Sequence, residues 1–233
     1  MEKRVAIVTA ASRGIGRACA DELAEREYKL VLMARSQEII EIARELDGVA
    51  FVGSVTEKKD LHDLVKLALE TYGRIDAVVN NTGHPPQGDL LSITDEQWLE
   101  GLDIILMNVI RLAREIVPIM QKQGGGAFVN ISTLGAVEPR LLYPVSSSLR
   151  GALSNFTKLF ADRYAADGIR MNNVLPGSID NHEISQDSLR AIPIGRGGSV
   201  IEVAKTAAFL LSNDASYITG QNIRVDGGLG KSV

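Results

Sequence analysis

The sequence has one cysteine, no long apolar run and no excess of basic residues. Cys19, alone among 233 residues, cannot form a disulfide within the chain. Its place in the helix expected after a glycine loop favours a small buried packing residue over a reactive thiol. No apolar run approaches the roughly 20 residues that span a bilayer, and the apolar stretch after Arg4 is too short for a signal peptide.

Charges of the two signs are balanced and interspersed. The chain has 25 lysines and arginines against 29 aspartates and glutamates, a formal net charge of −4 at pH 7. This balance provides no basic stripe for nucleic acid and no polybasic patch for a membrane. We therefore expect a cytoplasmic protein that binds neither nucleic acid nor a membrane.

Short β-branched runs alternate with longer amphipathic ones, and no linker or internal repeat interrupts them. This alternation predicts parallel strands joined by crossover helices. The strands are expected over residues 4–9, 29–34, 49–52, 75–80, 127–131, 169–175 and 221–225. Two apolar stripes at helical spacing predict helices that pack on the sheet: Leu61, Leu64, Val65, Ala68 and Tyr72, and Val200, Val203, Ala204, Ala207, Ala208 and Leu211.

The predicted fold class is α/β. We expect one doubly wound Rossmann-type domain over residues 1–233, with a seven-stranded parallel sheet flanked by helices on both faces. Ligands in such sheets bind beyond the carboxyl ends of the strands. The site is therefore expected in the loops that follow Val8, Ala34, Asn80, Ile131 and Leu175.

Gly14 and Gly16 follow the first predicted strand and open a helix. Without side chains, they let backbone N–H groups and the positive end of the helix approach a pyrophosphate. A glycine pair by itself is also consistent with a tight turn that binds nothing.

Further motifs accompany this loop. Asn80-Asn81-Thr82-Gly83 follows the fourth strand, Pro176-Gly177 the sixth, and Ile218-Thr219-Gly220-Gln221 lies near the end. With these motifs in order, the sequence resembles the short-chain dehydrogenase/reductase family over essentially its whole length. The usual first glycine of the loop is Ala10 here, a small residue that we expect to permit the turn.

The charge at the end of the second strand bears on the cofactor. A carboxylate there would accept hydrogen bonds from the ribose hydroxyls of NAD, whereas an arginine can bind the extra phosphate of NADP. This chain has Arg35 there and Arg13 in the glycine loop, which favours NADP(H) over NAD(H); the alternative is that both arginines are only solvated. The resemblance, with no metal implied, places the cofactor on Thr9, Ser12, Arg13, Gly14, Ile15, Gly16, Arg35, Ser54, Val55, Asn80, Asn81, Gly83, Pro176, Gly177 and Ile179.

The resemblance also implies a catalytic centre, and this sequence departs from it. The family uses a tyrosine as proton donor, a lysine four residues later, a serine and an asparagine. Aligning the motifs puts Ser146 at the tyrosine, Arg150 at the lysine, Thr133 at the serine and Ile105 at the asparagine. Thr133 still offers a hydroxyl and Arg150 a cation, but an alkyl hydroxyl is a much weaker acid than a phenol.

Other side chains could replace the missing acid. Tyr143 precedes Ser146 in a loop that borders the substrate in this family; it is alternatively a packed or interface aromatic. A three-residue shift of register would give Tyr143 the tyrosine role but would put Ser147 at the lysine, so we reject it. His84 is a second candidate for the acid; alternatively it is a solvated histidine in a loop. His182 could join the pocket wall, and His62 is expected to be solvated.

The segment 181–198 is the expected substrate loop. It is short and polar, with Glu183, Gln186, Asp187 and Arg190, so substrate closure is expected to be loose. Asn181 stands where the family has a threonine that touches the nicotinamide amide, and could make the same hydrogen bond.

Two functions fit these observations. The first is an NADP(H)-dependent oxidoreductase that moves hydride between the nicotinamide and a small carbonyl or alcohol, with Thr133, Ser146, Arg150 and Tyr143 as candidate catalytic residues. The second is a pseudoenzyme that binds NADP(H) as a sensor or scaffold. By resemblance we expect a homotetramer or homodimer, formed by helices over 95–123 and 146–166 through Leu106, Val109, Leu149, Leu153, Phe156 and Phe160.

Overall fold

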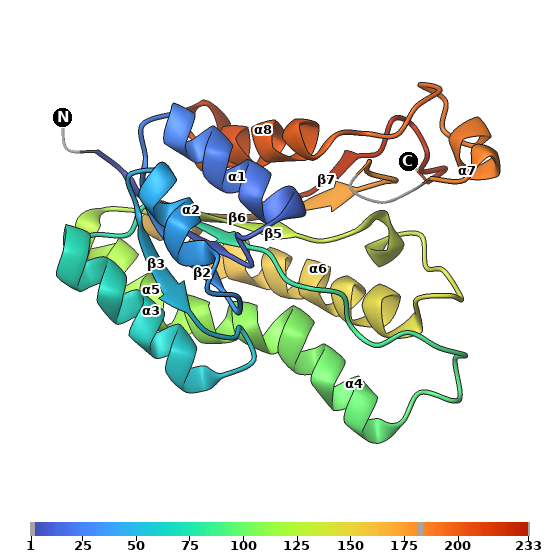
Figure 1. Cartoon of the computed structure of the whole chain (residues 1–233), viewed down its shortest axis with the longest axis horizontal. Helices are drawn as coiled ribbons and strands as arrows, with labels where there is room; N and C mark the ends of the chain where they lie inside the picture. Colours follow the sequence, from blue (N-terminus) through green and yellow to red (C-terminus); the bar gives the residue numbers. More distant parts are fainter. Residues whose placement is uncertain (1–2, 181–183, 233) are drawn as a thin grey trace.

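Seven parallel strands form one sheet in the computed structural model, which describes residues 3–180 and 184–232 (Figure 1). The strand order is β3-β2-β1-β4-β5-β6-β7, so the order reverses between β1 and β4. The strands are β1 (Val5–Thr9), β2 (Lys29–Ala34), β3 (Val49–Val52), β4 (Ala77–Asn80), β5 (Gly126–Ile131), β6 (Ile169–Pro176) and β7 (Asn222–Val225). All seven predicted strands are confirmed, with ends that differ by at most two residues.

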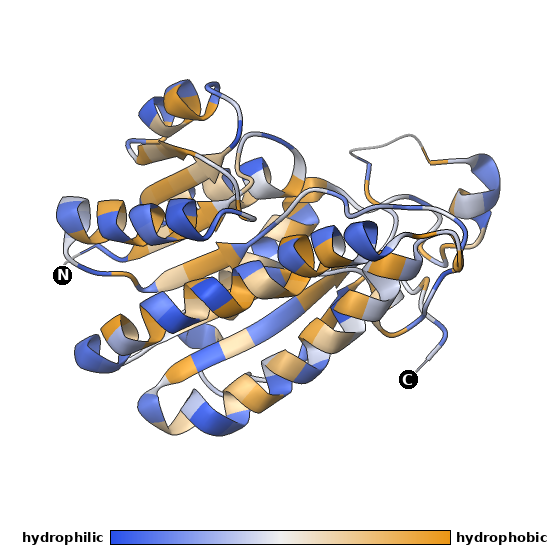
Figure 2. Cartoon of the chain, turned by 90° about the horizontal axis from the view of Figure 1, so that it is seen from below, coloured by the Kyte–Doolittle hydropathy of each residue, from blue (hydrophilic) through white to orange (hydrophobic). Residues whose placement is uncertain are grey.

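Helices cover both faces of the sheet, as predicted. Helices α1 (Gly14–Glu25), α2 (Ile39–Glu45) and α8 (Val200–Leu211) pack on one face. Helices α3 (Lys58–Tyr72), α5 (Asn108–Gln123) and α6 (Pro144–Tyr164) pack on the other. Helix α4 (Asp95–Leu102) precedes α5, and the short α7 (Gln186–Arg190) lies beyond β6. Figure 2 shows largely apolar strands between helices that carry hydrophilic residues.

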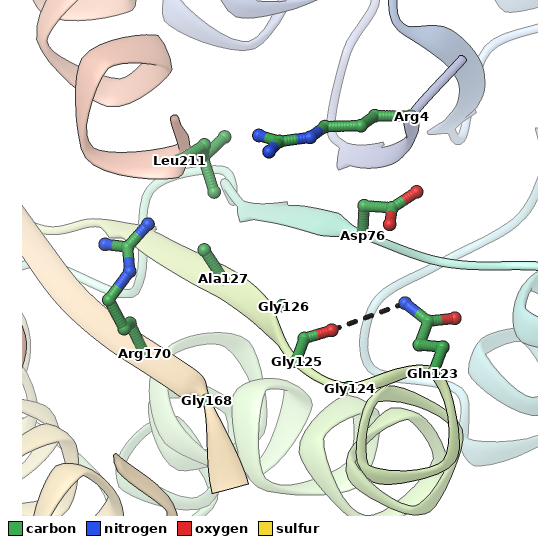
Figure 3. A pocket seen from close by; sticks show the side chains of 10 residues that line it. All are labelled: Arg4, Asp76, Gln123, Gly124, Gly125, Gly126, Ala127, Gly168, Arg170 and Leu211. Carbon is green, nitrogen blue, oxygen red and sulfur yellow. Dashed lines mark hydrogen bonds between the residues drawn. The ribbon is translucent and has the colours of Figure 1, made fainter. Parts of the chain in front are cut away.

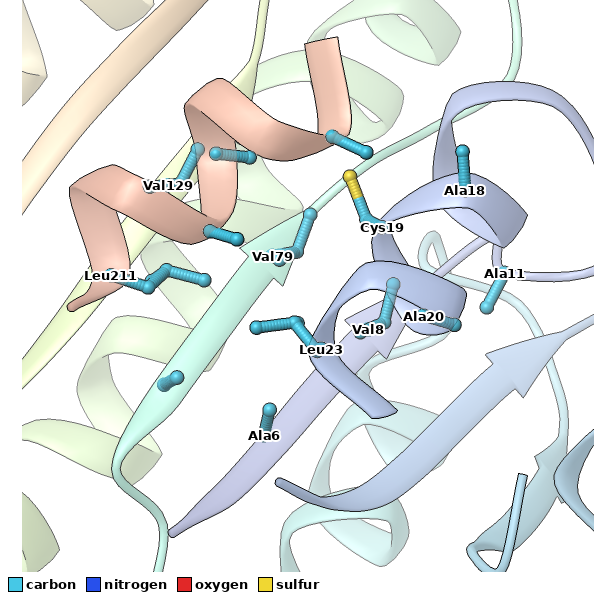
Figure 4. Packing of buried hydrophobic residues seen from close by; sticks show 14 of the residues in the cluster. Ala6, Val8, Ala11, Ala18, Cys19, Ala20, Leu23, Val79, Val129 and Leu211 are labelled. Carbon is cyan, nitrogen blue, oxygen red and sulfur yellow. The ribbon is translucent and has the colours of Figure 1, made fainter. Parts of the chain in front are cut away.

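The predicted helix stripes lie against the sheet. Leu61, Leu64, Val65 and Ala68 of α3 are buried, and the α8 stripe is buried from Val203 to Leu211. Cys19 packs between α1, α8 and the strands beneath them (Figure 4). Burial raises the pKa of the Cys19 thiol to about 12, so it is protonated at neutral pH and is an inert packing residue, as expected.

The helix expected over 95–123 is interrupted. A π-helical turn, Asp103–Met107, separates α4 from α5, and Ile105 within it is 1% exposed. Arg111 ties this turn to the α3 side: its guanidinium pairs with Asp103 at 2.7 Å and donates to the Thr56 carbonyl at 3.1 Å. Turns of this type are frequent at functional sites.

The apolar residues expected to make an oligomer surface are largely used within the chain. Val109, Leu153 and Phe160 are buried in the core between the sheet, α5 and α6. Leu106, Leu149 and Phe156 pack partly against that core. The sequence argument therefore overestimated the apolar area left for a partner, because it could not separate helix-to-helix packing within one chain from packing between chains.

A row of asparagines crosses the second half of the sheet. Asn80, Asn130, Asn173 and Asn222 are register partners on β4, β5, β6 and β7. Each side-chain amide donates to the next side-chain carbonyl along the row, at 2.7, 2.8 and 2.8 Å. Thr157 of α6 joins the row, donating to Asn173 at 3.0 Å. Buried amides are tolerated here because most of their polar atoms bond to one another; the Asn80 side-chain carbonyl has no partner among the described residues.

Asn130→Val tests the energetic weight of this row. It removes the acceptor of the buried Asn80 amide and a donor to Asn173, so we expect a loss of about 2–4 kcal/mol in the free energy of unfolding, measured by urea denaturation. Asn222→Asp, at the exposed end of the row, keeps a side-chain acceptor for the buried Asn173 amide and should cost below about 1 kcal/mol. Equal losses for the two variants would contradict a buried network.

Candidate active site

The predicted cofactor residues gather at the carboxyl ends of the strands around the β1/β4 reversal. Thr9 links the two loops there: its hydroxyl donates to the Asn81 carbonyl at 2.7 Å and accepts from the Asn81 N–H at 3.0 Å. The Asn81 amide donates in turn to the Ala10 carbonyl at 3.2 Å. A Cβ on Gly16 would lie 2.2 Å from that same carbonyl oxygen, so only glycine fits there.

The start of α1 has no protein cap. Arg13 at the N-cap makes no side-chain capping bond, and the first turn has no acidic residue. Gly14, Ile15 and Gly16 thus present backbone N–H groups and the positive end of the helix to the loop, next to the half-buried Ser12. This end of α1 is suited to an anion.

Ala10 forms the turn that the family makes with glycine, but in a strained backbone. Its φ is 48°, in the left-handed region, and Gly14 has a φ of 56°. A residue with a Cβ costs roughly 1–2 kcal/mol in this region. The expectation that alanine permits the turn is therefore confirmed, with strain in the phosphate loop that the sequence did not predict.

Arg13 and Arg35 are both exposed beside this loop. Among the residues described, neither makes an ion pair, whereas nearby Arg17 pairs with Asp21 at 2.8 Å and Glu45 at 3.0 Å. Half-buried Ser54 and Val55 follow β3, whose Val52 is the register partner of Ala34. The two arginines are therefore available to a ligand at the ends of β1 and β2.

The remaining cofactor candidates lie along the same edge. Asn80 is buried at the end of β4, and Gly83 is exposed in the loop after it. Pro176 ends β6; Gly177 is followed by Ile179, which is 7% exposed. A Cβ on Gly177 would lie 2.8 Å from the Asp226 Cα, so β6 and the segment after β7 approach closely there.

Three of the four candidate catalytic residues lie at the start of α6. Tyr143 is its N-cap, and with Ser146, Ser147 and Arg150 it follows the i, i+3, i+4, i+7 spacing of one helix face. Tyr143 and Ser146 are half-buried. The Ser147 hydroxyl accepts from the Arg140 N–H at 3.2 Å, so it supports the preceding loop.

Arg150 is 8% exposed, and one guanidinium nitrogen (Nη1) donates to the Ile131 carbonyl at 2.6 Å. Burial lowers the pKa of Arg150 to about 10, so it is still charged at neutral pH. Thr133 is half-buried two residues beyond that carbonyl, and its hydroxyl accepts from the Gly135 N–H at 3.4 Å. The structure thus brings the ends of β5 and α6 together through Arg150.

Two polar residues here were not singled out from the sequence. The Ser132 hydroxyl and the Asn108 side-chain carbonyl are buried with no hydrogen-bond partner among the described residues. Asn108 follows the π-helical turn and donates to the Ile104 carbonyl at 2.8 Å. Both could have been found in the sequence, because each is a polar residue within an apolar stretch. Ile105 itself packs in the core, so an asparagine at 105 would place an amide among apolar side chains.

The other sequence candidates are dispersed. His84 is exposed in the loop after β4. His62 lies on α3, exposed and 3.3 Å from Glu115, away from the site and solvated as expected. Asn181, His182 and Glu183 lie outside the described residues. Gln186, Asp187 and Arg190 are exposed on or beside α7.

The C-terminal segment is bound to Glu138, in the loop after β5. One Glu138 carboxylate oxygen accepts from the backbone N–H groups of Lys231 at 2.6 Å and Ser232 at 2.7 Å. These hydrogen bonds, above all the one from the Ser232 N–H, lower the pKa of the Glu138 carboxyl. Glu138 follows the short turn that begins at Thr133, so the tail is fastened to the segment between Thr133 and Tyr143.

A cavity of about 210 Å³ lies at the opposite, amino-terminal end of the strands (Figure 3). Arg4, Asp76 and Arg170 line it with glycines of the β5 and β6 starts. Arg170 donates to the carbonyls of Leu210 at 2.7 Å and Ser212 at 2.9 Å, so it fixes the end of α8. Arg170 therefore has a structural role at this end of the sheet.

Two further kinds of site are absent from the described part of the chain. No group of three or more His, Cys, Asp or Glu side chains there is placed to hold a metal ion. No helix there has the length and apolar character needed to cross a bilayer.

The strand order and the uncapped glycine loop at the reversal define a Rossmann-type nucleotide-binding protein. A family model described as enoyl-(acyl carrier protein) reductase matches residues 9–230. The chain belongs to the short-chain dehydrogenase/reductase family.

Curated relatives cover the chain almost completely. The 3-oxoacyl-(acyl-carrier-protein) reductase FabG of Vibrio cholerae is 30% identical over 239 residues, with 98% of each chain covered. The Haemophilus influenzae enzyme of the same name is 33% identical over 239 residues, covering 98% of this chain and 99% of its own. The solved structure of L-sorbose reductase from Gluconobacter frateurii, complexed with NADPH and L-sorbose, covers 100% of this chain and 98% of its own at 29% identity, with a TM-score of 0.91.

Ala10→Gly should stabilise the protein. Glycine relieves the left-handed strain at φ 48°, and we expect the free energy of unfolding to rise by about 1 kcal/mol. The matched control is Ala11→Gly, next in the chain and fully buried, which should lower it by about 1 kcal/mol. Urea denaturation of both variants measures this. A loss of stability in Ala10→Gly would show that the loop is not strained.

Proposed function

We propose that this protein is an NADP(H)-dependent oxidoreductase that moves hydride between the nicotinamide and a carbonyl or alcohol group. One observation carries the proposal: the uncapped start of α1 lies beside two exposed arginines, Arg13 and Arg35, that pair with no described carboxylate. A pyrophosphate fits the helix end, and a 2′-phosphate fits the arginines. The NADPH complex of L-sorbose reductase, a structural neighbour, supports the same cofactor.

The cofactor, when bound, supplies or accepts the hydride. The candidate residues have separate parts. The Thr133 and Ser146 hydroxyls orient the substrate oxygen, and Arg150 favours negative charge that develops on it. A water held by Ser146, or the Tyr143 phenol, delivers the proton. Orientation and charge supply part of the acceleration without a strong acid.

The names of the relatives favour an enzyme over the cofactor-binding sensor or scaffold, since the curated relatives reported above are named as reductases. The homotetramer or homodimer and the cytoplasmic location stay predictions. Leu99 of α4 and Leu159 of α6 are 62% and 68% exposed, so each offers apolar surface to a partner subunit.

Cofactor preference is the first test. We expect NADPH to bind at least about tenfold more tightly than NADH, a difference of about 1.4 kcal/mol that a charge-assisted phosphate contact supplies. Arg35→Asp should remove or reverse the preference. The control is Arg44→Asp, an equal charge change on the exposed side of α2. Fluorescence titration of both cofactors measures the affinities, and equal affinities in the wild type would contradict the assignment.

The proton donor is the second test. In NADPH-oxidation assays on a panel of ketones, Ser146→Ala should lower kcat about tenfold or more, as expected for a lost proton-transfer group. Tyr143→Phe should stay close to wild type. The control is Ser148→Ala, on the exposed side of α6. The double change Ser146→Tyr with Arg150→Lys, which restores the family pair, should raise carbonyl reduction.

Each outcome assigns the donor. Loss of turnover in Tyr143→Phe alone would make Tyr143 the donor. If an active wild type is matched by both single variants, neither hydroxyl donates the proton. No NADPH oxidation by the wild type on any substrate would favour the sensor or scaffold.

A further inference from the structure

Arg150 is a buried cation that has no anionic partner among the described residues. Its only hydrogen bond from the guanidinium goes to the neutral Ile131 carbonyl, and its Nε has no partner. Among the partly buried arginines, Arg74 pairs with Asp76 at 2.8 Å and Arg111 with Asp103 at 2.7 Å, whereas Arg170 donates to three backbone carbonyls. Buried charges are costly unless they are paired. A negative charge is therefore missing from this part of the chain.

The helix that carries Arg150 also begins without negative charge. Helix α6 has 21 residues, its N-cap Tyr143 makes no side-chain capping bond, and its first turn has no acidic residue. By contrast, α4 and α8 both start with a capping box and an acid in the first turn. The first two turns of α6 thus carry two positive features, the end of the helix dipole and the Arg150 guanidinium.

This part of α6 is partly exposed to solvent. Ser146 lies one helical turn before Arg150 on the same face and is half-buried, not sealed. Its side chain is short, and it stands where the family has a tyrosine. The nicotinamide ribose, which the family lysine contacts, offers neutral hydroxyls and so leaves the guanidinium charge uncompensated.

We propose that the first two turns of α6 form a subsite for a carboxylate of the substrate, with Arg150 as the residue that sets this specificity. The inference rests on the proposed function and narrows it: the substrate is an oxo acid, or the corresponding hydroxy acid, with a free carboxylate close to the reacting carbon. Hydride from NADPH forms the new C–H bond, a proton from solvent forms the O–H bond, and NADP⁺ is released. The carboxylate is bound but unchanged.

Matched substrate pairs test the specificity. Pyruvate and acetoacetate are compared with their methyl esters in NADPH-oxidation assays. We compare the ratio of kcat/KM for each acid to kcat/KM for its ester. This ratio should be at least about tenfold higher in the wild type than in Arg150→Met, mainly because the wild type has a lower KM for the acid. Arg150→Lys should keep part of this preference. The control is Lys158→Met, which removes a charge from the exposed side of α6 and should change nothing.

A binding experiment keeps the subsite separate from turnover. Malonate, a carboxylate with no ketone to reduce, is titrated into the NADPH-loaded protein and followed by cofactor fluorescence. We expect binding that Arg150→Met weakens at least tenfold. Malonate binding without any turnover would support the subsite and contradict the proposed function; turnover with no preference for acids and no malonate binding would overturn the subsite alone.

Stability supplies a readout that does not depend on catalysis. Ser146→Asp places a carboxylate one turn before Arg150, a favourable spacing for an ion pair. It should raise the Tm and abolish malonate binding while NADPH still binds. Arg150→Met removes an uncompensated buried charge, so its Tm should equal or exceed that of the wild type. A lower Tm in both variants would mean that Arg150 already has its counter-charge and would overturn the proposal.

Discussion

A buried amide that bonds to a side chain on the neighbouring strand tolerates one alignment of the two strands and no other. Asn80, Asn130 and Asn173 apply this constraint to β4, β5 and β6, and Asn222 extends it to β7. The carboxyl ends of these strands are thereby held at fixed levels. The segments that follow them bring Asn81, Thr133 and Gly177 to one edge, where the glycine loop after β1 also lies.

The site combines a retained charge with a lost acid. Arg150 keeps a cation where the family has lysine, but Ser146 cannot replace a phenol as a proton donor. In the proposed reaction two contributions that depend on position would remain: orientation of the reactants and a fixed charge near the developing one. A buried arginine cannot lose its proton at neutral pH, so its part is restricted to electrostatics.

The repeating features of the fold could be predicted, and the single exceptions could not. Strand and helix periods extend over many residues, so all seven strands and the α3 and α8 stripes were found. The glycine loop and Arg35 are local signals at fixed distances from a strand. The π-helical turn at Asp103–Met107 leaves no signal in the residue pattern. The sequence therefore predicted a regular α-helix through these residues.

Other features depend on contacts distant in sequence. The asparagines of the row are about 50 residues apart, and only the register joins them. That Arg150 lacks a counter-charge is a fact about its neighbours, which sequence spacing does not give. The strain at Ala10 was hidden for a simpler reason: the sequence shows a small residue, and only its φ of 48° shows a conformation suited to glycine.

The attachment of the C-terminal segment to Glu138 has a practical side. The two chain ends lie far apart, with the C-terminus on the side of α7 and β7 and the N-terminus at the opposite end of the sheet (Figure 1). Lys231 and Ser232 are bound directly to Glu138, in the segment between Thr133 and Tyr143. A bulky group attached at Ser232 therefore lies beside the segment that joins Thr133 to Tyr143. One attached before β1 lies at the opposite end of the sheet.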